Sequence, residues 1–185
     1  VGTVTMTPSF AEKPTAEVAT ALLAIEKHRV TRRIAVAGDR FSAGDARLDV
    51  LHPPPVGPPG TENERSLVIA VRFAGHTVLL TGDLENAGTE RLLELPSQPA
   101  AVLMAPHHGS EKALSPGLVA WSRPRLVVAS RGQTQTNSVK PGHAGLGVPI
   151  WNTRDYGAIA IRLHASGVTA EAFRTGERLV VERGK

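Results

Sequence analysis

Two short segments of the sequence place residue types that bind metal ions directly after apolar runs. The run at 77–80 is followed by Asp83, and the run at 101–104 is followed by His107 and His108. Both runs are typical of buried strands, so the carboxylate and the imidazoles are expected at strand-to-loop transitions, where side chains from separate strands can converge. A hard carboxylate oxygen together with imidazole nitrogen suits zinc, manganese or iron in the divalent state.

A simpler interpretation of the same residues stays open. An Asp after a strand often only caps a helix or closes a turn, because its side chain accepts hydrogen bonds from free backbone N–H groups. A pair of adjacent imidazoles is harder to explain in that way, since Gly109 allows the sharp backbone turn that such a loop needs. The pair His107 and His108 therefore indicates a site more strongly than Asp83 does alone.

The composition is typical of a strand-rich domain with many turns. The chain has 185 residues, of which 41% are hydrophobic and only 4% aromatic, so Val, Leu, Ile and Ala must build the core of what we expect to be a single domain, residues 1–185. The 18 glycines and 14 prolines predict short connections. There is no cysteine, which excludes disulfides and thiolate metal sites in this chain. No segment reads as a membrane span or a signal peptide, so we expect this chain itself to be soluble.

The balance of charges leaves two interpretations open. The formal net charge is +4, which is compatible with binding a polyanion such as a nucleic acid. The basic residues are scattered, however, and only Arg29, Arg32 and Arg33 form a local cluster, so a merely solvated surface explains the charge equally well.

The pattern of elements predicts a layered α/β arrangement with the candidate ligands at one edge of a sheet. Helices are expected with N-caps at Thr15, Thr89 and Ser115. Strands are expected at 1–6, 34–36, 48–51, 67–71, 77–80, 101–104, 126–129, 158–163, 168–173 and 179–181. The segments at 53–60 and 131–147 are predicted to be loops, because they are rich in Pro, Gly or polar residues.

Six segments, taken as a set in this order, resemble the C-terminal metallo-β-lactamase-like domain of the ComEC competence-protein family. They are Leu48–Pro53, Asn63–Val68, Leu80–Glu85, Pro106–Ser110, Ser130–Gly132 and Thr153–Ile159. The set is specific, whereas any one of these segments alone is weak. The resemblance implies a partial αββα metallo-β-lactamase-like sandwich, with a dinuclear metal site at one edge, and a bacterial membrane protein that takes up transforming DNA as its parent.

The resemblance also implies roles for individual residues. Asp83 would bridge two divalent ions, zinc or manganese, and His107 and His108 would reach the second ion or the scissile phosphate, with Asp83 and His107 as the catalytic pair. Two such ions activate a water molecule and neutralise the charge on the phosphoryl oxygens. Four further residues are expected to shape the substrate-binding floor or to contact the substrate: Asn63, Ser66, Ser110 and His143.

The sequence departs from the family pattern at two places. The first metal motif of the family, His-x-His-x-Asp-His, does not occur in these residues, so the chain is expected to begin downstream of it. Asp83 and two histidines cannot organise two ions, and the isolated chain is expected to bind metal poorly and to be inactive or nearly so. In addition, Ala144 follows His143 where the family carries a proline.

The leading hypothesis is a metal-dependent phosphodiesterase or nuclease domain of a competence protein for DNA uptake. DNA and the transmembrane channel domain of the same parent would be its partners, the parent would hold it at the bacterial membrane, and it would need no small-molecule cofactor. A second enzymatic hypothesis keeps the fold but changes the substrate to a small phosphodiester or an ester. The alternative is a non-catalytic, degenerate lactamase-like module that binds DNA or a membrane partner domain.

Overall fold

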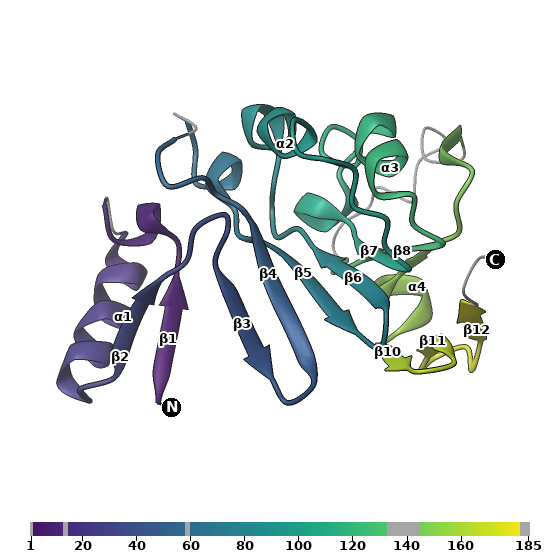
Figure 1. Ribbon diagram of the computed structural model, residues 1–185, viewed down its shortest axis with the longest axis horizontal. Coiled ribbons are helices and arrows are strands. Elements are labelled where there is room, and N and C mark those ends of the chain that lie inside the picture. Colours follow the sequence, from purple (N-terminus) through teal and green to yellow (C-terminus); the bar gives the residue numbers. More distant parts are fainter. Residues whose placement is uncertain (1, 13–14, 58–59, 133–144, 182–185) are drawn as a thin grey trace.

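A seven-stranded mixed sheet forms the centre of the molecule, with its strands in the order β3-β4-β5-β6-β7-β8-β9 (Figure 1). The structure is a computed structural model that describes residues 2–12, 15–57, 60–132 and 145–181. Strands β3 to β6 pair antiparallel, and β6 to β9 pair parallel. Their bounds are Arg40–Ala43 for β3, Ala46–His52 for β4, Val68–Phe73 for β5, His76–Leu80 for β6, Val102–Met104 for β7, Leu126–Ala129 for β8 and Ile150–Asn152 for β9.

Two crossover helices make the second half of this sheet parallel. Helix α2, Asn86–Leu93, connects β6 to β7, and helix α3, Pro116–Ser122, connects β7 to β8. Because a parallel pair needs a crossover that carries the chain back, β6, β7 and β8 all end at the same edge of the sheet. The predicted order of strand, helix, strand, helix and strand between 78 and 129 is confirmed, and this order brings the segments after β6 and β7 together.

Alternating side chains of the central strands fill two separate cores. Leu103 on β7 and Val127 on β8 face the helices, whereas Val102 and Val128 face a second, three-stranded antiparallel sheet. That sheet consists of β10, Ile159–His164, β11, Gly167–Ala172, and β12, Arg178–Val181. Figure 1 shows α2 and α3 on one side of the central sheet and the smaller sheet on the other. The period-two alternation of a strand buried on both faces produces this layering.

A small unit at the N-terminal end lies beside the free edge of β3 (Figure 1). Strands β1, Thr3–Met6, and β2, Thr31–Ile34, pair parallel and are joined through the 3-10 helix η1, Pro8–Ala11, and helix α1, Ala16–Lys27. Thr15 caps α1 as predicted, since its Oγ1 accepts the N–H of Val18 at 3.4 Å. The apolar residues on one face of α1 are only half-buried, because the helix covers just two strands.

Several local predictions were wrong or incomplete. Thr89 does not cap α2 but is buried within it, because the helix begins three residues earlier, at Asn86. Strands β3 and β9 and the short helix α4, Thr153–Tyr156, were not predicted. Ser115 caps α3 as predicted, with the N–H of Leu118 donating to its Oγ at 3.2 Å.

Within the described residues, no helix is both long and apolar enough to cross a membrane.

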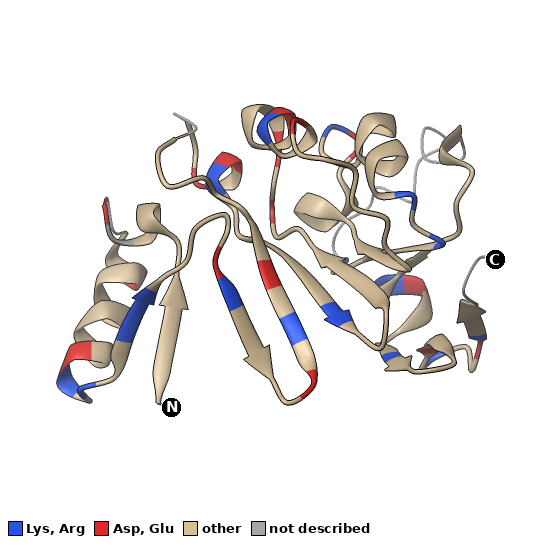
Figure 2. Cartoon of the chain, viewed as in Figure 1, with Lys and Arg blue, Asp and Glu red and all other residues tan. Residues whose placement is uncertain are grey.

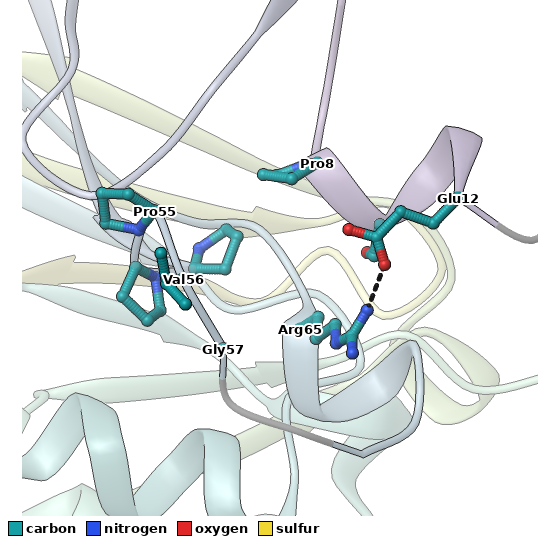
Figure 3. Close-up of a pocket in the computed structure, with 9 residues that line it drawn as sticks. Pro8, Glu12, Pro55, Val56, Gly57 and Arg65 are labelled. Atoms are coloured by element: carbon teal, nitrogen blue, oxygen red, sulfur yellow. Dashed lines mark hydrogen bonds and ion pairs between the residues drawn. The ribbon is translucent and has the colours of Figure 1, made fainter.

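The proline-rich segment after β4 and the N-terminal unit enclose a small pocket (Figure 3). Figure 3 shows Arg65 of the 3-10 helix η2, Asn63–Arg65, pointing towards Glu12 across this pocket. The guanidinium and the carboxylate form an ion pair at 2.8 Å. This contact connects the N-terminal unit to the segment that carries Asn63 and Ser66.

Candidate functional site

The candidate ligands gather at the edge where β6 and β7 end. Asp83 follows β6, and His107 and His108 follow β7. The Nε2 of His108 lies 3.7 Å from the Oδ1 of Asp83. The two side chains are 49% and 46% exposed, so a carboxylate and an imidazole from different strands share an edge that is open to solvent.

Two hydrogen bonds connect the segments that carry these side chains. The hydroxyl of Thr81, which is buried, donates to the carbonyl of Met104 at 2.6 Å. The N–H of His107 donates to the carbonyl of Gly82 at 3.1 Å. The spacing between Asp83 and the histidine pair is therefore determined by the backbone and by a buried side chain, rather than by exposed side chains alone.

The histidine pair occupies an unusual backbone conformation. His107 has a φ of 46° and His108 a φ of 56°, and the next residue, Gly109, has a φ of 76°. Residues other than glycine lose on the order of 1–2 kcal/mol in this left-handed region. A Cβ atom at Gly109 would lie 3.0 Å from the Cβ of Ala129, so a side chain there would also crowd β8. The sharp turn expected at Gly109 is present.

Arg131 holds this turn in place. Its Nε donates to the carbonyl of His108 at 3.2 Å, and its Nη2 donates to the carbonyl of Gly109 at 2.6 Å. The backbone of Arg131 is fixed in turn by the hydroxyl of Thr153, which accepts its N–H at 2.8 Å and donates to its carbonyl at 3.0 Å. Sequence reasoning missed Arg131. Its position directly after Ser130, at the end of a buried strand, was the available signal.

Both imidazoles are oriented through Nδ1. The Nδ1 of His108 lies 3.0 Å from the carbonyl oxygen of Ser130, and that of His107 lies 2.9 Å from the Oε2 of Glu85. Carbonyl and ionised carboxylate oxygens only accept hydrogen bonds, so each Nδ1 carries a proton, and Nε2 is the nitrogen with which a neutral ring could bind a metal. Metal-binding imidazoles in proteins are oriented by outer partners in this way.

Glu85 connects His107 to the segment after β4. Its Oε1 accepts a hydrogen bond from Nδ2 of Asn63 at 3.0 Å, while its Oε2 accepts from His107. The hydrogen bonds from Asn63 and His107 hold the pKa of the Glu85 carboxyl below its ordinary value, so Glu85 is ionised at neutral pH. Glu85 belongs to the segment Leu80–Glu85 of the family resemblance, but the sequence alone indicated no role for it.

The structure describes three of the four predicted substrate-binding residues, and each of the three has its own surroundings. Asn63 donates to Glu85 instead of presenting a free amide, and the hydroxyl of Ser110 accepts the N–H of Ala113 at 3.2 Å, which closes a turn. Ser66 packs under the loop after β6, because a Cβ atom at Gly82 would lie 3.4 Å from the Cβ of Ser66. His143 lies outside the described residues.

His52, at the end of β4, is a buried histidine close to Ser66. Its Nδ1 donates to the carbonyl of Ser66 at 2.8 Å, and within the described part of the chain its Nε2 has no hydrogen-bond partner. Burial lowers the pKa of His52 below its ordinary value, because the charged imidazolium would lose its hydration. The hydrogen bond to Ser66 opposes this shift only in part.

We expect His52 to make the folded state less stable as the pH falls below about 6.5. The unfolded chain binds a proton there that the buried ring does not, so the free energy of unfolding should fall by up to about 1.4 kcal/mol per pH unit until the lowered pKa is reached. Urea unfolding of the protein and of His52→Gln at several pH values measures this share. The exposed His164→Gln variant is the control, and equal pH dependence in all three proteins would contradict the assignment.

The fold has relatives among solved structures. A candidate metal-dependent hydrolase from Parabacteroides distasonis aligns with a TM-score of 0.51 and 14% identity over 83% of this chain and 76% of that protein. A candidate Zn-dependent hydrolase of the metallo-β-lactamase superfamily from Thermotoga maritima aligns over 80% of this chain and 64% of that protein, with a TM-score of 0.41 and 14% identity. The first of these alignments shows that the chain shares a layered α/β fold with that protein, and the predicted α/β fold class is confirmed.

Two sequence relatives of the chain are competence proteins. ComE operon protein 3 of Bacillus subtilis is 31% identical over 97 residues, which are 52% of this chain and 12% of that protein. Competence protein ComA of Neisseria gonorrhoeae is 32% identical over 123 residues, 61% of this chain and 17% of that protein. No protein-family model matches the chain. The relatives confirm the resemblance to the ComEC competence-protein family, and the matched part spans less than a fifth of either relative.

Proposed function

We propose that this chain forms part of a metal-dependent phosphodiesterase or nuclease domain that acts on DNA during its uptake. One observation carries the proposal. His107 and His108 are each oriented through Nδ1, and the free Nε2 of His108 lies beside Asp83. Imidazoles that served only as surface residues would not need two separate outer acceptors and a strained turn.

The residues present fit a divalent ion in chemistry and in spacing. Two ligands of a tetrahedral zinc ion, each bound at about 2.0–2.2 Å, lie roughly 3.3–3.6 Å apart. The Nε2 of His108 and the Oδ1 of Asp83, at 3.7 Å, are close to this separation. Among the described residues, however, no group of three or more His, Cys, Asp or Glu is close enough to hold a metal. The edge therefore supplies part of a ligand set, and we expect little activity from these ligands alone.

The side chains at the edge divide the chemistry between them. Bound zinc or manganese ions, two in a complete site, would activate a water molecule and neutralise charge on the phosphoryl oxygens. Asp83 and His108 would hold the metal side of the site. His107, with the ionised Glu85 behind its Nδ1, can accept a proton at Nε2 and then donate a hydrogen bond to a phosphate oxygen or a leaving oxygen. Ser66, Ser110 and His143 stay proposed contacts of the substrate, and His143 lies outside the described residues.

The choice of DNA as the substrate is supported by the competence relatives and by the net charge of +4. A polyanion is attracted to a basic protein through its phosphates. The transmembrane part of the same parent protein would be the partner that delivers the strand and keeps the domain at the membrane. A non-catalytic module that binds DNA without metal is the second candidate. The observation in its favour is the small number of ligand side chains grouped together in the described part of the chain.

Titration with Zn²⁺, followed by NMR of the imidazole nitrogens, tests the proposal. We expect the Nε2 signals of His108 and His107 to shift, and we expect Asp83→Asn to weaken binding at least tenfold, since the variant loses one charged ligand. Asp45→Asn, which changes an exposed carboxylate in the turn between β3 and β4, should bind as the unmodified chain does. If Zn²⁺ shifts neither histidine while DNA still binds, the non-catalytic module is the correct function.

A further inference from the structure

A second cluster of charged side chains lies on the helix-facing side of β3, β4 and β5, away from the candidate metal edge. Arg72, at the end of β5, pairs in register with Thr77 near the start of β6, and β6 runs from there towards Asp83. Arg47 on β4 lies opposite Arg72, and Arg40 on β3 lies opposite Asp49. Figure 2 shows basic segments next to one another on these three strands. The cluster therefore occupies the end of the sheet opposite the metal edge.

One carboxylate holds all three guanidinium groups. Asp49 accepts from the Nε of Arg72 at 2.7 Å, and the Nε atoms of Arg47 and Arg40 lie 3.0 Å and 3.6 Å from its Oδ1. Burial raises the pKa of the Asp49 carboxyl, but the hydrogen bond from Arg72 and the charge of Arg47 outweigh it and bring the pKa below its ordinary value. Asp49 is therefore an ionised anchor at neutral pH.

The three arginines differ in what their outer nitrogens contact. Each of the three guanidinium nitrogens of Arg72 has a partner. Besides the contact of its Nε with Asp49, its Nη1 donates to Thr77 Oγ1 at 3.0 Å and its Nη2 donates to the side-chain oxygen of Gln98 at 2.6 Å. For Arg40 and Arg47, by contrast, the described part of the chain offers no partner to the Nη atoms, and their side chains are 75% and 54% exposed. Arg40 and Arg47 thus contact Asp49 through Nε as ion pairs without a hydrogen bond to its Oδ1, and their Nη atoms are left open.

These open ends line a hollow between the sheet and the segment after α2. Arg40, Arg47, Arg72 and Gln98 line it together with two carboxylates, Asp49 and Asp39. The carboxylate of Asp39 accepts the N–H of Val36 at 3.0 Å, so it is engaged with its own turn. Three positive and two negative groups leave a net charge of +1, concentrated at the exposed arginines. Arginine forks of this kind match the oxygens of a phosphate group.

We infer that Arg40 and Arg47 bind a backbone phosphate of a nucleic-acid strand in this hollow. The choice of a strand, rather than a free phosphate ion, rests on the proposed function. The hollow then provides a second region of contact for the same substrate, at the opposite end of the sheet, that depends on neither metal nor hydrolysis. Phosphate contacts of this kind position a strand without reading its sequence.

Fluorescence anisotropy with a labelled single-stranded oligonucleotide in EDTA tests the inference. Removing both cations in Arg40→Gln/Arg47→Gln should weaken binding about tenfold near 0.1 M salt. It should also reduce the slope of log K against log salt by about 0.7, the value for one phosphate contact with a single strand. Arg162→Gln/Arg178→Gln on the smaller sheet, where Arg162 also pairs with a carboxylate, is the matched control and should bind as the unmodified protein does.

Two results would overturn the inference in a protein whose circular dichroism is unchanged. The first is equal affinity and equal salt dependence in the Arg40/Arg47 variant. The second is thermal stabilisation of the unmodified protein by inorganic phosphate that the Arg40/Arg47 variant loses without any change in oligonucleotide binding, which would assign the hollow to a free phosphate ion. Because EDTA removes divalent metals, neither result depends on whether the metal edge is catalytic.

Discussion

Replacing Asp83 by alanine is expected to abolish metal-dependent hydrolysis by the full-length natural protein. Asp83 is the carboxylate nearest His108, and a metal ion that loses a charged ligand no longer holds an activated water in place. A metal-bound nucleophile and its charge stabilisation are together worth several kcal/mol, so we expect a loss of about a thousandfold or more in rate. The measurement is the rate of phosphodiester cleavage with Mn²⁺ or Zn²⁺ present.

The fold should survive this substitution. The Asp83 side chain is 46% exposed and lies beyond the end of β6, so its removal leaves both cores intact. Asp45→Ala, at another exposed carboxylate, serves as the control for general effects of a removed charge. Wild-type rates in the folded Asp83→Ala protein would remove Asp83 from the mechanism.

Replacing Gly88 by alanine is expected to destabilise the protein although alanine favours helices. A Cβ atom at Gly88 would lie 2.3 Å from the backbone carbonyl oxygen of Glu64 and 2.7 Å from Cδ1 of Leu84. The helix α2 and η2 would have to move apart, at a cost of about 1–3 kcal/mol. For a chain of this size, that cost lowers the midpoint of thermal unfolding by roughly 2–4 °C per kcal/mol.

Gly117 in α3 offers a matched control for this substitution. A Cβ atom there would make only an ordinary contact, 3.4 Å from Cδ1 of Leu93, so Gly117→Ala should stabilise the protein by about 0.4–1 kcal/mol. Because η2 carries Asn63, Gly88→Ala should also weaken the hydrogen bond from Asn63 to Glu85 and thereby loosen His107. Equal melting temperatures for the two variants would contradict the close approach of α2 and η2.

The order of the layers could be predicted because it depends on local patterns. Apolar runs such as 126–129 are long enough for strands, and Ser115 followed by Pro116 specifies a helix start through a side-chain cap and a fixed φ. Thr89 was misassigned because cap residues also occur inside helices, where packing decides their position. Strand β9, Ile150–Asn152, was missed because only two of its residues are apolar, and so short an apolar run does not indicate a strand.

The partners of the candidate ligands could not be predicted from the sequence. Glu85 meets His107 across 22 positions of the chain, and Arg131 meets the carbonyl of Gly109 across the same separation. Such contacts depend on how β6, β7 and β8 align at their ends, which is a property of the sheet. A carboxylate after a strand and an arginine in a loop are too common in sequences to indicate these roles by themselves.

The layered sheet explains why the metal edge and the basic hollow are separate. Parallel strands deliver Asp83, His107 and His108 to one end, whereas the antiparallel strands β3, β4 and β5 carry Arg40, Arg47 and Arg72 towards the other. A DNA strand that contacts both regions would be positioned at one and cleaved at the other. Removal of the Arg40 and Arg47 side chains should therefore raise KM for DNA cleavage while kcat changes little, since these contacts are the same in the bound substrate and in the transition state.

Cleavage of DNA by the full-length natural protein, freed of metal by chelation and then supplied with Mn²⁺ or Zn²⁺, is the most direct test of the proposed function. We predict no cleavage without metal, cleavage when metal is restored, and none in the Asp83→Ala protein under either condition. Cleavage that continues in excess chelator, or a folded protein that binds metal through His107 and His108 and cleaves no phosphodiester, would contradict it.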